Sequence, residues 1–248
     1  MVFNPRDMQK YILIYVTLLC TYFSSAQEIS GEITYEVNYN IEIMKERLKE
    51  AEKNGVKSDN SNYIEKFINN SAPVNAILKF NKSFSSYKVI KTLDSDNSKG
   101  FKPVKIVAGN NKEYYRDLQL NRNAFISDAL GTEYLVIYPD VEYEITSETK
   151  LIQGYTCYKA IRKDKSKPNY IAWFTLELPF SFGPKEVHSL IGLVLQYDDG
   201  VAFTFVAKEI KLKGKNSKIE SMPNIKEMSF EEYQKLMRKI CLNFSLCG

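Results

Sequence analysis

Histidine is nearly absent from this chain of 248 residues, in which His188 is the only one. A zinc site built on two histidines is therefore excluded, because the chain cannot supply the second ligand. The sequence also lacks a P-loop, a G-x-G-x-x-G fingerprint and a G-x-S-x-G nucleophile elbow,. We therefore predict no catalytic residue, no metal site and no cofactor.

An excess of one charge is lacking as well. The 34 Lys and Arg residues oppose 30 Asp and Glu residues, which leaves a formal net charge of +4. The two signs are interspersed along the chain, so we expect no basic patch of the kind that binds nucleic acid or an acidic membrane surface. The sequence therefore predicts no nucleic-acid partner.

No apolar run in the chain is long enough to cross a membrane. Residues 11–23 are mostly apolar, follow a basic stretch and precede the small residues 24–26. A membrane-spanning helix needs about 18 or more apolar residues, so this run is too short. The pattern predicts a cleaved signal peptide at 1–26 and a single domain at 27–248, with no transmembrane span after cleavage. We expect the mature protein in the periplasm, associated with the outer membrane, or outside the cell.

Cysteine is scarce, and its count is odd once the leader is removed, because Cys157, Cys241 and Cys247 remain. An exported protein can keep disulfides, and an odd count leaves at least one thiol unpaired or bridged to a partner. Cys241 and Cys247 are the candidate disulfide, and a bridge from Cys157 to either of them is the alternative that the sequence leaves open. A catalytic Cys157–His188 pair has little support, since nothing supplies a third orienting group. We expect a buried strand cysteine and a histidine on a surface loop instead.

Period-two alternation of apolar and polar residues dominates the rest of the chain. In EITYEVNY at 32–39 every second residue is apolar, which predicts a half-buried antiparallel strand,. The turn residues Asp199-Gly200 between two apolar alternations give the strongest hairpin signal. The other predicted strands are 74–80, 84–91, 103–109, 112–118, 122–128, 133–139, 142–148, 155–162, 169–176, 192–198 and 201–210.

Three segments have helical periodicity. Apolar residues recur at three- and four-residue spacing in 41–55 and 61–70, and 229–240 opens with a capping box, Ser229 with Glu232,. Strands and helices do not alternate regularly, so we do not expect a parallel βαβ architecture. We predict a mainly β fold: a large, strongly curved antiparallel sheet, shaped as a bowl or half-barrel. Two amphipathic helices follow its first strand, and a helix lies at the C-terminus.

The stretch ELPFSFGPKEVHSLIGLVLQYDDG interrupts the strand pattern. Pro179 and Pro184 cannot donate to a sheet, and each disfavours helix in the residue before it. Residues 178–188 should therefore leave the sheet as an extended loop. Leu190, Leu193 and Leu195 then restore an apolar face.

Two residues before this stretch have predictable structural roles. Gly154 stands where a turn enters a strand, so its freedom at φ is useful there. Trp173, which shares its side of a strand with Ile171 and Thr175, is predicted to anchor the core.

Two segments together resemble the GLPGLI family of exported proteins from Bacteroidota. IQGYTCYKA at 152–160 is similar to the family's G-Y-x-C-x-K-A strand. AWFTLELPFSFGP at 172–184 is similar to its A-W-[FY]-[ST] strand and the connection that follows, and the naming motif is degraded to SLIGLV at 189–194. The matching residues are Gly154, Tyr155, Cys157, Lys159, Ala160, Ala172, Trp173, Phe174, Thr175, Pro179, Gly183, Pro184, Leu190, Gly192 and Leu193.

The resemblance implies an exported envelope protein of a family without an established enzymatic activity. It also implies kinship with the bowl-shaped β domain at the N-terminus of one bacterial peptide:N-glycosidase, whose catalytic domain is separate. We expect no catalytic module to follow the β domain of this chain. The predicted function is that of a non-catalytic binding or interaction module whose partner is an unidentified envelope protein.

A carrier of a lipid or other apolar ligand is the alternative function. A curved sheet has a concave face for such a ligand, and the helices at 41–70 could cover it as a lid lined by Met44, Leu48, Tyr63 and Phe67. An apolar hollow of about 300 Å³ or more would favour the carrier. A concave face filled by side chains would argue against it.

Overall fold

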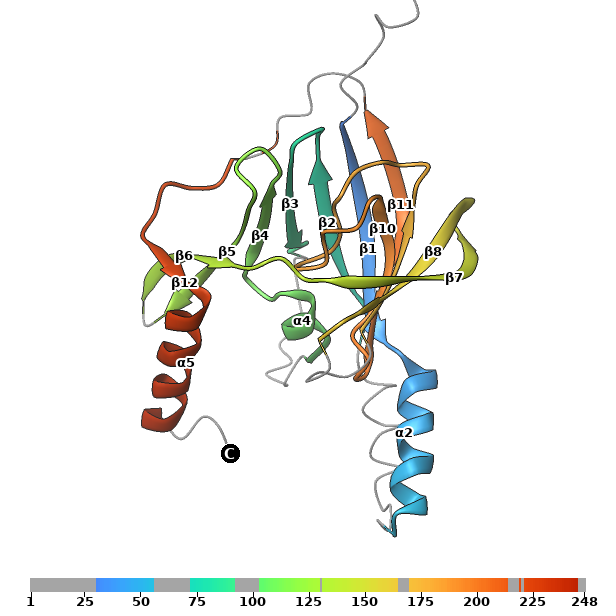
Figure 1. The fold of residues 1–248 in the computed structure, drawn as a ribbon. Helices are drawn as coiled ribbons and strands as arrows, with labels where there is room; N and C mark the ends of the chain where they lie inside the picture. The colour runs from blue at the N-terminus through green and yellow to red at the C-terminus, as the bar shows by residue number, and fades with distance from the viewer. Residues whose placement is uncertain are drawn as a thin grey trace, which may run out of the picture.

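The computed structural model of the chain describes residues 30–55, 72–91, 103–129, 131–164, 170–213, 219 and 221–244. Within these residues the chain forms one sheet of twelve strands and three helices (Figure 1). The strands are β1 (Ser30–Tyr39), β2 (Val74–Phe80), β3 (Phe84–Val89), β4 (Glu113–Asp117), β5 (Arg122–Ala129), β6 (Thr132–Tyr138), β7 (Tyr143–Ile152), β8 (Tyr155–Arg162), β9 (Ile171–Thr175), β10 (Leu193–Asp198), β11 (Phe203–Lys213) and β12 (Glu227–Ser229). The helices are α2 (Ile41–Lys53), α4 (Pro103–Ala108) and α5 (Phe230–Phe244). The predicted leader at 1–26, the predicted helix at 61–70 and Cys247 lie outside the described residues.

Neighbouring strands pair antiparallel, apart from one short strand at the edge. The order across the sheet is β12-β6-β5-β4-β3-β2-β1-β11-β10-β9-β8-β7. The edge strand β12 runs parallel to β6. Its three residues are too few for an alternation pattern to reveal a strand, so the sequence did not predict it.

The connection between β6 and β7 requires the sheet to curve. These strands follow one another in sequence, yet they stand second and twelfth in the sheet order. Ten spacings of about 4.8 Å would separate them by roughly 48 Å in a flat sheet, whereas the steps from Tyr138 to Tyr143 reach at most about 18 Å. The two flanks therefore turn toward each other, and β7 crosses the front of the central strands in Figure 1. The predicted mainly β, bowl-like sheet is confirmed. One correction concerns strand direction, because a wholly antiparallel sheet was predicted and β12 pairs parallel with β6.

The concave face of the sheet carries the main hydrophobic core. Ile33 pairs with Leu78, Leu78 with Tyr87, and Tyr87 with Tyr114, so one buried apolar row crosses β1 to β4. Alternate residues of β1 are buried and half-buried, as expected for a strand with one face on the core,.

The loop at 178–188 folds into the concave face instead of passing over its rim. The ring centroids of Phe180 and Phe182 lie 4.9 and 6.3 Å from that of Phe80 on β2. Leu190 is buried as well. The predicted exit from the sheet is therefore confirmed, and the loop fills much of the bowl with its own side chains.

Two glycines let this loop approach other backbone closely. A Cβ atom on Gly192 would lie 2.1 Å from the carbonyl oxygen of Thr175, and one on Gly183 would lie 2.2 Å from that of Val187. Neither glycine has a positive φ. Space, rather than backbone conformation, therefore requires glycine at both positions.

The segment 103–109, predicted as a strand, is the helix α4 instead. Pro103 occupies its first position, where a missing N–H costs nothing, and Gly109 ends it with a φ of 125°,. Val104 and Ala108 lie one turn apart and are buried. A run of six residues fits both periods, so the alternation alone could not distinguish helix from strand.

The helix α2 extends from the end of β1 away from the sheet (Figure 1). It is capped by Asn40, whose side-chain oxygen accepts a hydrogen bond from the N–H of Ile43 at 3.2 Å,. Met44 near its start packs against the main core. Because Tyr63 and Phe67 lie outside the described residues, the lid over the concave face stays a prediction. No helix within the described residues is long and apolar enough to cross a membrane.

Trp173 is only half-buried and packs against the main core from its margin, which corrects the prediction of an anchor within the core. Its neighbours Ala172 and Phe174 take the concave side of β9, and the half-buried indole lies on the other face. There the ammonium of Lys150 stands 4.1 Å from the ring centroid and donates a hydrogen bond to Gln196 at 2.7 Å. The alternation in this strand was predicted with the wrong side inward, because both sides carry large apolar residues.

Both predicted turn residues have the expected geometry. Gly154, with a φ of 82°, follows Gln153, with a φ of 51°, at the hairpin between β7 and β8. Two successive positive φ values are typical of a two-residue hairpin. At the β10–β11 hairpin, the Asp199 carboxylate accepts hydrogen bonds from three backbone N–H groups at 2.9 Å each.

Candidate functional site

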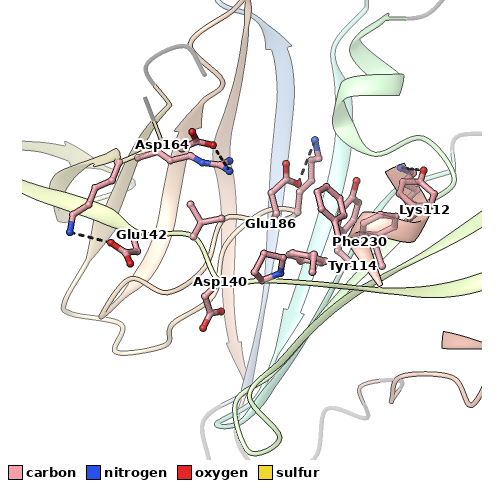
Figure 2. A pocket seen from close by; sticks show the side chains of 15 residues that line it. Lys112, Tyr114, Asp140, Glu142, Asp164, Glu186 and Phe230 are labelled. Atoms are coloured by element: carbon pink, nitrogen blue, oxygen red, sulfur yellow. Dashed lines mark hydrogen bonds and ion pairs between the residues drawn. The ribbon is translucent and has the colours of Figure 1, made fainter. Parts of the chain in front are cut away.

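A cavity of about 700 Å³ opens on the concave side of the sheet (Figure 2). It lies among the loop at 178–188, the β6–β7 connection and the start of α5. Its volume is in the range of small-molecule sites. The lining residues are Lys112, Tyr114, Phe125, Tyr138, Pro139, Asp140, Val141, Glu142, Arg162, Lys163, Asp164, Lys185, Glu186, Phe230 and Tyr233.

Aromatic rings form one end of the cavity. Tyr114, Phe125 and Tyr138 project from β4, β5 and β6, with centroids 5.5 Å apart in the first pair and 5.8 Å in the second. Tyr233 of α5 meets Phe125 edge-on at 5.3 Å. These rings are more than nine-tenths buried and pack on one another, so they form an aromatic wall of which only a small part is exposed to the cavity,.

The N-terminus of α5 positions two of these aromatic residues. The predicted capping box is confirmed: the N–H of Ser229 donates to the Glu232 carboxylate at 3.0 Å, and the N–H of Glu232 donates to the Ser229 hydroxyl at 3.2 Å,. The box fixes the first turn of the helix, which carries Phe230 and Tyr233. The hydroxyl of Ser127 on β5 also donates to Tyr233 at 3.2 Å.

Lys112 lies at the same end. Its ammonium donates a hydrogen bond to the hydroxyl of Tyr233 at 3.1 Å. The same nitrogen stands 4.5 Å from the ring centroid of Phe125 and 5.2 Å from that of Tyr233. These are cation–π distances, so the rings hold a positive charge against the aromatic wall.

The other end of the cavity is lined by ion pairs (Figure 2). Arg162 lies 3.7 Å from Asp164, and Lys163 lies 3.4 Å from Glu142. The Lys163–Glu142 pair is exposed and contributes little to stability, so its groups can exchange partners with a ligand at low cost, whereas the Arg162 side chain is largely buried,. Between the two ends, Lys185 stands 3.8 Å from the carboxylate of Glu186.

Tyr114 and Tyr138 remain protonated at neutral pH. Burial raises the pKa values of both phenols well above their usual range, and the nearby negative charge of Glu186 raises both values further,. The buried hydroxyl of Tyr138 has no hydrogen-bond partner among the described residues. This hydroxyl oxygen has almost no exposed surface, so in this structure it does not face the open space of the cavity.

Asp140 fastens the β6–β7 connection to the sheet. Its carboxylate accepts a hydrogen bond from Asn123 at 2.8 Å and lies 3.2 Å from Arg116. It points away from Glu186 in Figure 2. Burial alone would raise the pKa of Asp140, but the Asn123 hydrogen bond and the Arg116 charge lower it below its ordinary value. The group therefore stays ionised and holds the connection in place.

His188 is buried, which corrects the prediction of a histidine on a surface loop. Only 2% of the residue is exposed, because the loop that carries it folds into the bowl. Its Nδ1 lies 3.0 Å from the Ser189 hydroxyl and 3.5 Å from Asp140. Burial lowers the pKa of His188 to about 4, and the charge of Arg116 acts in the same direction. The ring is therefore neutral at pH 7.

Cys157 is a buried free thiol on β8, as expected of a strand cysteine. Burial raises its pKa to about 11, so the nucleophilic thiolate is not populated at neutral pH,. Neither Cys157 nor His188 lines the cavity. Cys241 is disulfide-bonded, which leaves Cys157 out of that bridge. The pairing of Cys241 with Cys247 stays a prediction, because Cys247 lies outside the described residues.

None of the family-motif residues lines the cavity. Gly183 and Gly192 give the loop room, Ala160 is buried, and Lys159 pairs with Glu148 at 2.8 Å. Their roles in the described structure are therefore packing and pairing. Within the described residues, no group of His, Cys, Asp and Glu side chains is arranged to hold a metal ion.

Several lining residues were absent from the sequence predictions. Lys112, Phe230 and Tyr233 come from segments more than a hundred residues apart, and nothing in either segment alone indicates a site. Lys185 and Glu186 are the lining residues that the sequence could have indicated, because they are two charges inside an otherwise apolar loop. Such charges are expected to face a polar space when their neighbours are buried.

The chain matches one described family. The model of that family, the N-terminal domain of the N-glycanase peptide, matches residues 57–236. No curated protein sequence matches the chain.

Two solved structures of PNGF-II have the same fold. They superpose on 85% and 86% of the chain with a TM-score of 0.51 each, at 18% and 19% sequence identity. The chain spans only about a third of those proteins, 33% and 34% of their lengths. At this identity the likeness extends to the fold alone.

Proposed function

Because this chain belongs to the family of the N-glycanase N-terminal domain, we propose that it is a non-catalytic accessory module that binds glycan-bearing ligands in its concave cavity. The observation that carries the proposal is the cavity of about 700 Å³, which joins an aromatic end to a charged end. Aromatic rings stack on the apolar faces of sugar rings, and charged side chains bind sugar hydroxyls.

The absence of catalysis is part of the proposal. The matched family is described as an N-terminal domain of a glycanase. In the described structure the thiol of Cys157 and the imidazole of His188 are both buried and neutral at pH 7. These observations support binding rather than bond cleavage.

The apolar-carrier alternative has less support. The loop at 178–188 occupies the concave face, and eight of the fifteen residues that line the cavity are charged. A lipid chain would remove these charged groups and ion pairs from water without offering them any polar contact, at a cost of several kcal/mol in order of magnitude.

The chain is expected to retain N-linked glycopeptides and to release no glycan from them. Phe230→Ala should weaken binding about tenfold, because it removes a ring from the cavity. Calorimetric titration measures the affinity, and mass spectrometry of the incubated glycopeptide measures release. Phe84→Ala is the matched control, since Phe84 packs against Tyr115 outside the cavity. Release of glycan, or no retention of any glycopeptide, would overturn the proposal.

We also propose that the protein is exported to the cell envelope and belongs to the GLPGLI group, as the leader pattern at 1–26 and the motif residues suggest. Protein isolated from the envelope fraction should begin at Gln27. Intact-mass measurement checks this. A species that keeps Met1 and stays in the cytosol would contradict export.

A further inference from the structure

Lys112 differs from the other basic residues of the cavity in its pairing. Arg162, Lys163 and Lys185 each have a carboxylate within 3.8 Å. Among the described residues, no carboxylate forms an ion pair with Lys112, whose contacts are one hydroxyl and two rings. The four acidic lining residues are all engaged elsewhere. The aromatic end of the cavity therefore holds a cation that is not ion-paired, and the Glu186 carboxylate, whose charge reaches Tyr114, is paired with Lys185.

The surroundings of Lys112 fix this charge without neutralising it. An ammonium group has three donors, and the Tyr233 hydroxyl accepts one of them at 3.1 Å,. The Phe125 and Tyr233 rings restrict the position of the nitrogen by cation–π contact,. The remaining donors have no partner among the described residues, and the side chain lines the cavity. A held cation with unused donors is suited to a charge-assisted hydrogen bond with an anion.

We propose that the aromatic end is a subsite for an acidic sugar, in which Lys112 binds the carboxylate. Tyr114 and Phe230, which line the cavity, provide ring surface for the apolar face of the sugar. The inference rests on the proposed function and narrows its ligand class. A sugar is favoured over a bare anion because the aromatic wall beside Lys112 would remain uncovered by a small ion.

Lys112 also ties α5 to the sheet through Tyr233, so a purely structural role has to be separated from binding. If Lys112 has only a structural role, its loss lowers the stability of the fold and changes the affinities for charged and neutral ligands equally. A subsite affects the preference for the charged ligand. The test therefore measures a ratio of affinities rather than one affinity.

The experiment titrates the full chain with sialyllactose, with its methyl ester and with lactose at low salt. The ester keeps the sugar and removes the charge. The wild-type chain is expected to bind sialyllactose about tenfold more tightly than the ester. Lys112→Met should abolish this ratio, and Lys112→Arg should keep most of it. Lys226→Met is the matched control and should not change the ratio, because Lys226 lies over Tyr134, 5.4 Å from its centroid, outside the cavity.

The outcomes separate this inference from the proposed function. Equal affinity for the acid and the ester in the wild-type chain overturns the anion subsite and leaves glycan binding intact. That comparison needs no variant, so it holds even if Lys112→Met fails to fold. If folded Lys112→Met still prefers sialyllactose to its ester, the carboxylate binds elsewhere, and this result also overturns the subsite. Inorganic phosphate bound as tightly as sialyllactose overturns the sugar assignment, and no binding of any glycan overturns the proposed function itself.

Discussion

Replacing Gly192 by alanine is expected to destabilise the fold by about 3 kcal/mol or more. The new Cβ would lie 2.1 Å from the carbonyl oxygen of Thr175 and 2.8 Å from its carbonyl carbon. Thr175 belongs to β9, which is hydrogen-bonded to β8 on one side and β10 on the other. The contacted backbone therefore cannot move without breaking strand pairing. The loop would have to detach from the sheet instead.

Gly183→Ala is expected to cost less, about 2 kcal/mol. Its Cβ would meet the carbonyl oxygen of Val187 at 2.2 Å and the side chain of Val194 at 2.9 Å. The closest contact belongs to the same loop, which can shift more easily than a central strand. A larger loss of stability in Gly192→Ala than in Gly183→Ala would therefore show that the backbone at Thr175 is held more firmly than the backbone at Val187.

Gly154→Ala is the comparison that separates lack of space from backbone conformation. No atom lies within 4 Å of a Cβ at this position, but φ is 82°. The cost should be about 1 kcal/mol, and Gly154→Asn should recover part of it, because asparagine tolerates the left-handed region. Urea unfolding followed by fluorescence of the single tryptophan, Trp173, measures all the variants. Equal losses for Gly192→Ala and Gly154→Ala would refute the close packing of the loop.

The strands could be predicted from the sequence because one face of the sheet is a continuous core. Alternation in 32–39 reflects burial on one side and half-exposure on the other, and β1 has that pattern,. The strand predicted at 103–109 is wrong, because the short segment PVKIVA fits a helical turn as well as a strand,. The prediction that Trp173 anchors the core was wrong for a related reason, since both sides of β9 carry bulky apolar residues.

The candidate site was much less predictable than the sheet. Its lining comes from residues such as Lys112, Arg162 and Tyr233, which only the curvature of the sheet brings to one cavity. Alone, each has the pattern of an ordinary surface or helix residue. The motif residues were visible in sequence, but Gly183 and Gly192 explain how the loop packs rather than what the cavity binds.

The fold is expected to lose about 3 kcal/mol of stability between pH 7 and pH 4 through His188. The side chain is buried in the bowl beside Tyr138, with ring centroids 5.7 Å apart. Its Nε2 is buried without a hydrogen-bond partner among the described residues. Protonation would place a charge there. Burial and the positive Arg116 oppose this charge more strongly than Asp140 and Glu186 favour it.

The direction of the effect follows from proton uptake in the two states. The folded chain keeps His188 neutral down to a pKa of about 4, whereas the unfolded chain takes up the proton near pH 6.5,. Between these values the unfolded state binds more protons, so stability falls as pH falls and is fully present above about 6.5. Asp140 acts in the same direction, but its loss begins only below roughly pH 4, where an ordinary carboxyl titrates,. The loss of stability between pH 6.5 and pH 4 is therefore caused mainly by His188.

His188→Gln should flatten the pH dependence in that window, whatever it does to stability at pH 7. Because the chain has no other histidine, the difference in slope between the two proteins isolates one group. Urea unfolding at several pH values between 7 and 4.5 gives the slope, which should approach about 1.4 kcal/mol per pH unit in the wild type. The imidazole C–H resonance of the folded protein should titrate near pH 4. A resonance that titrates near 6.5, or equal slopes in the two proteins, would show that the ring takes up a proton freely. In that case the loop does not seal the bowl around His188.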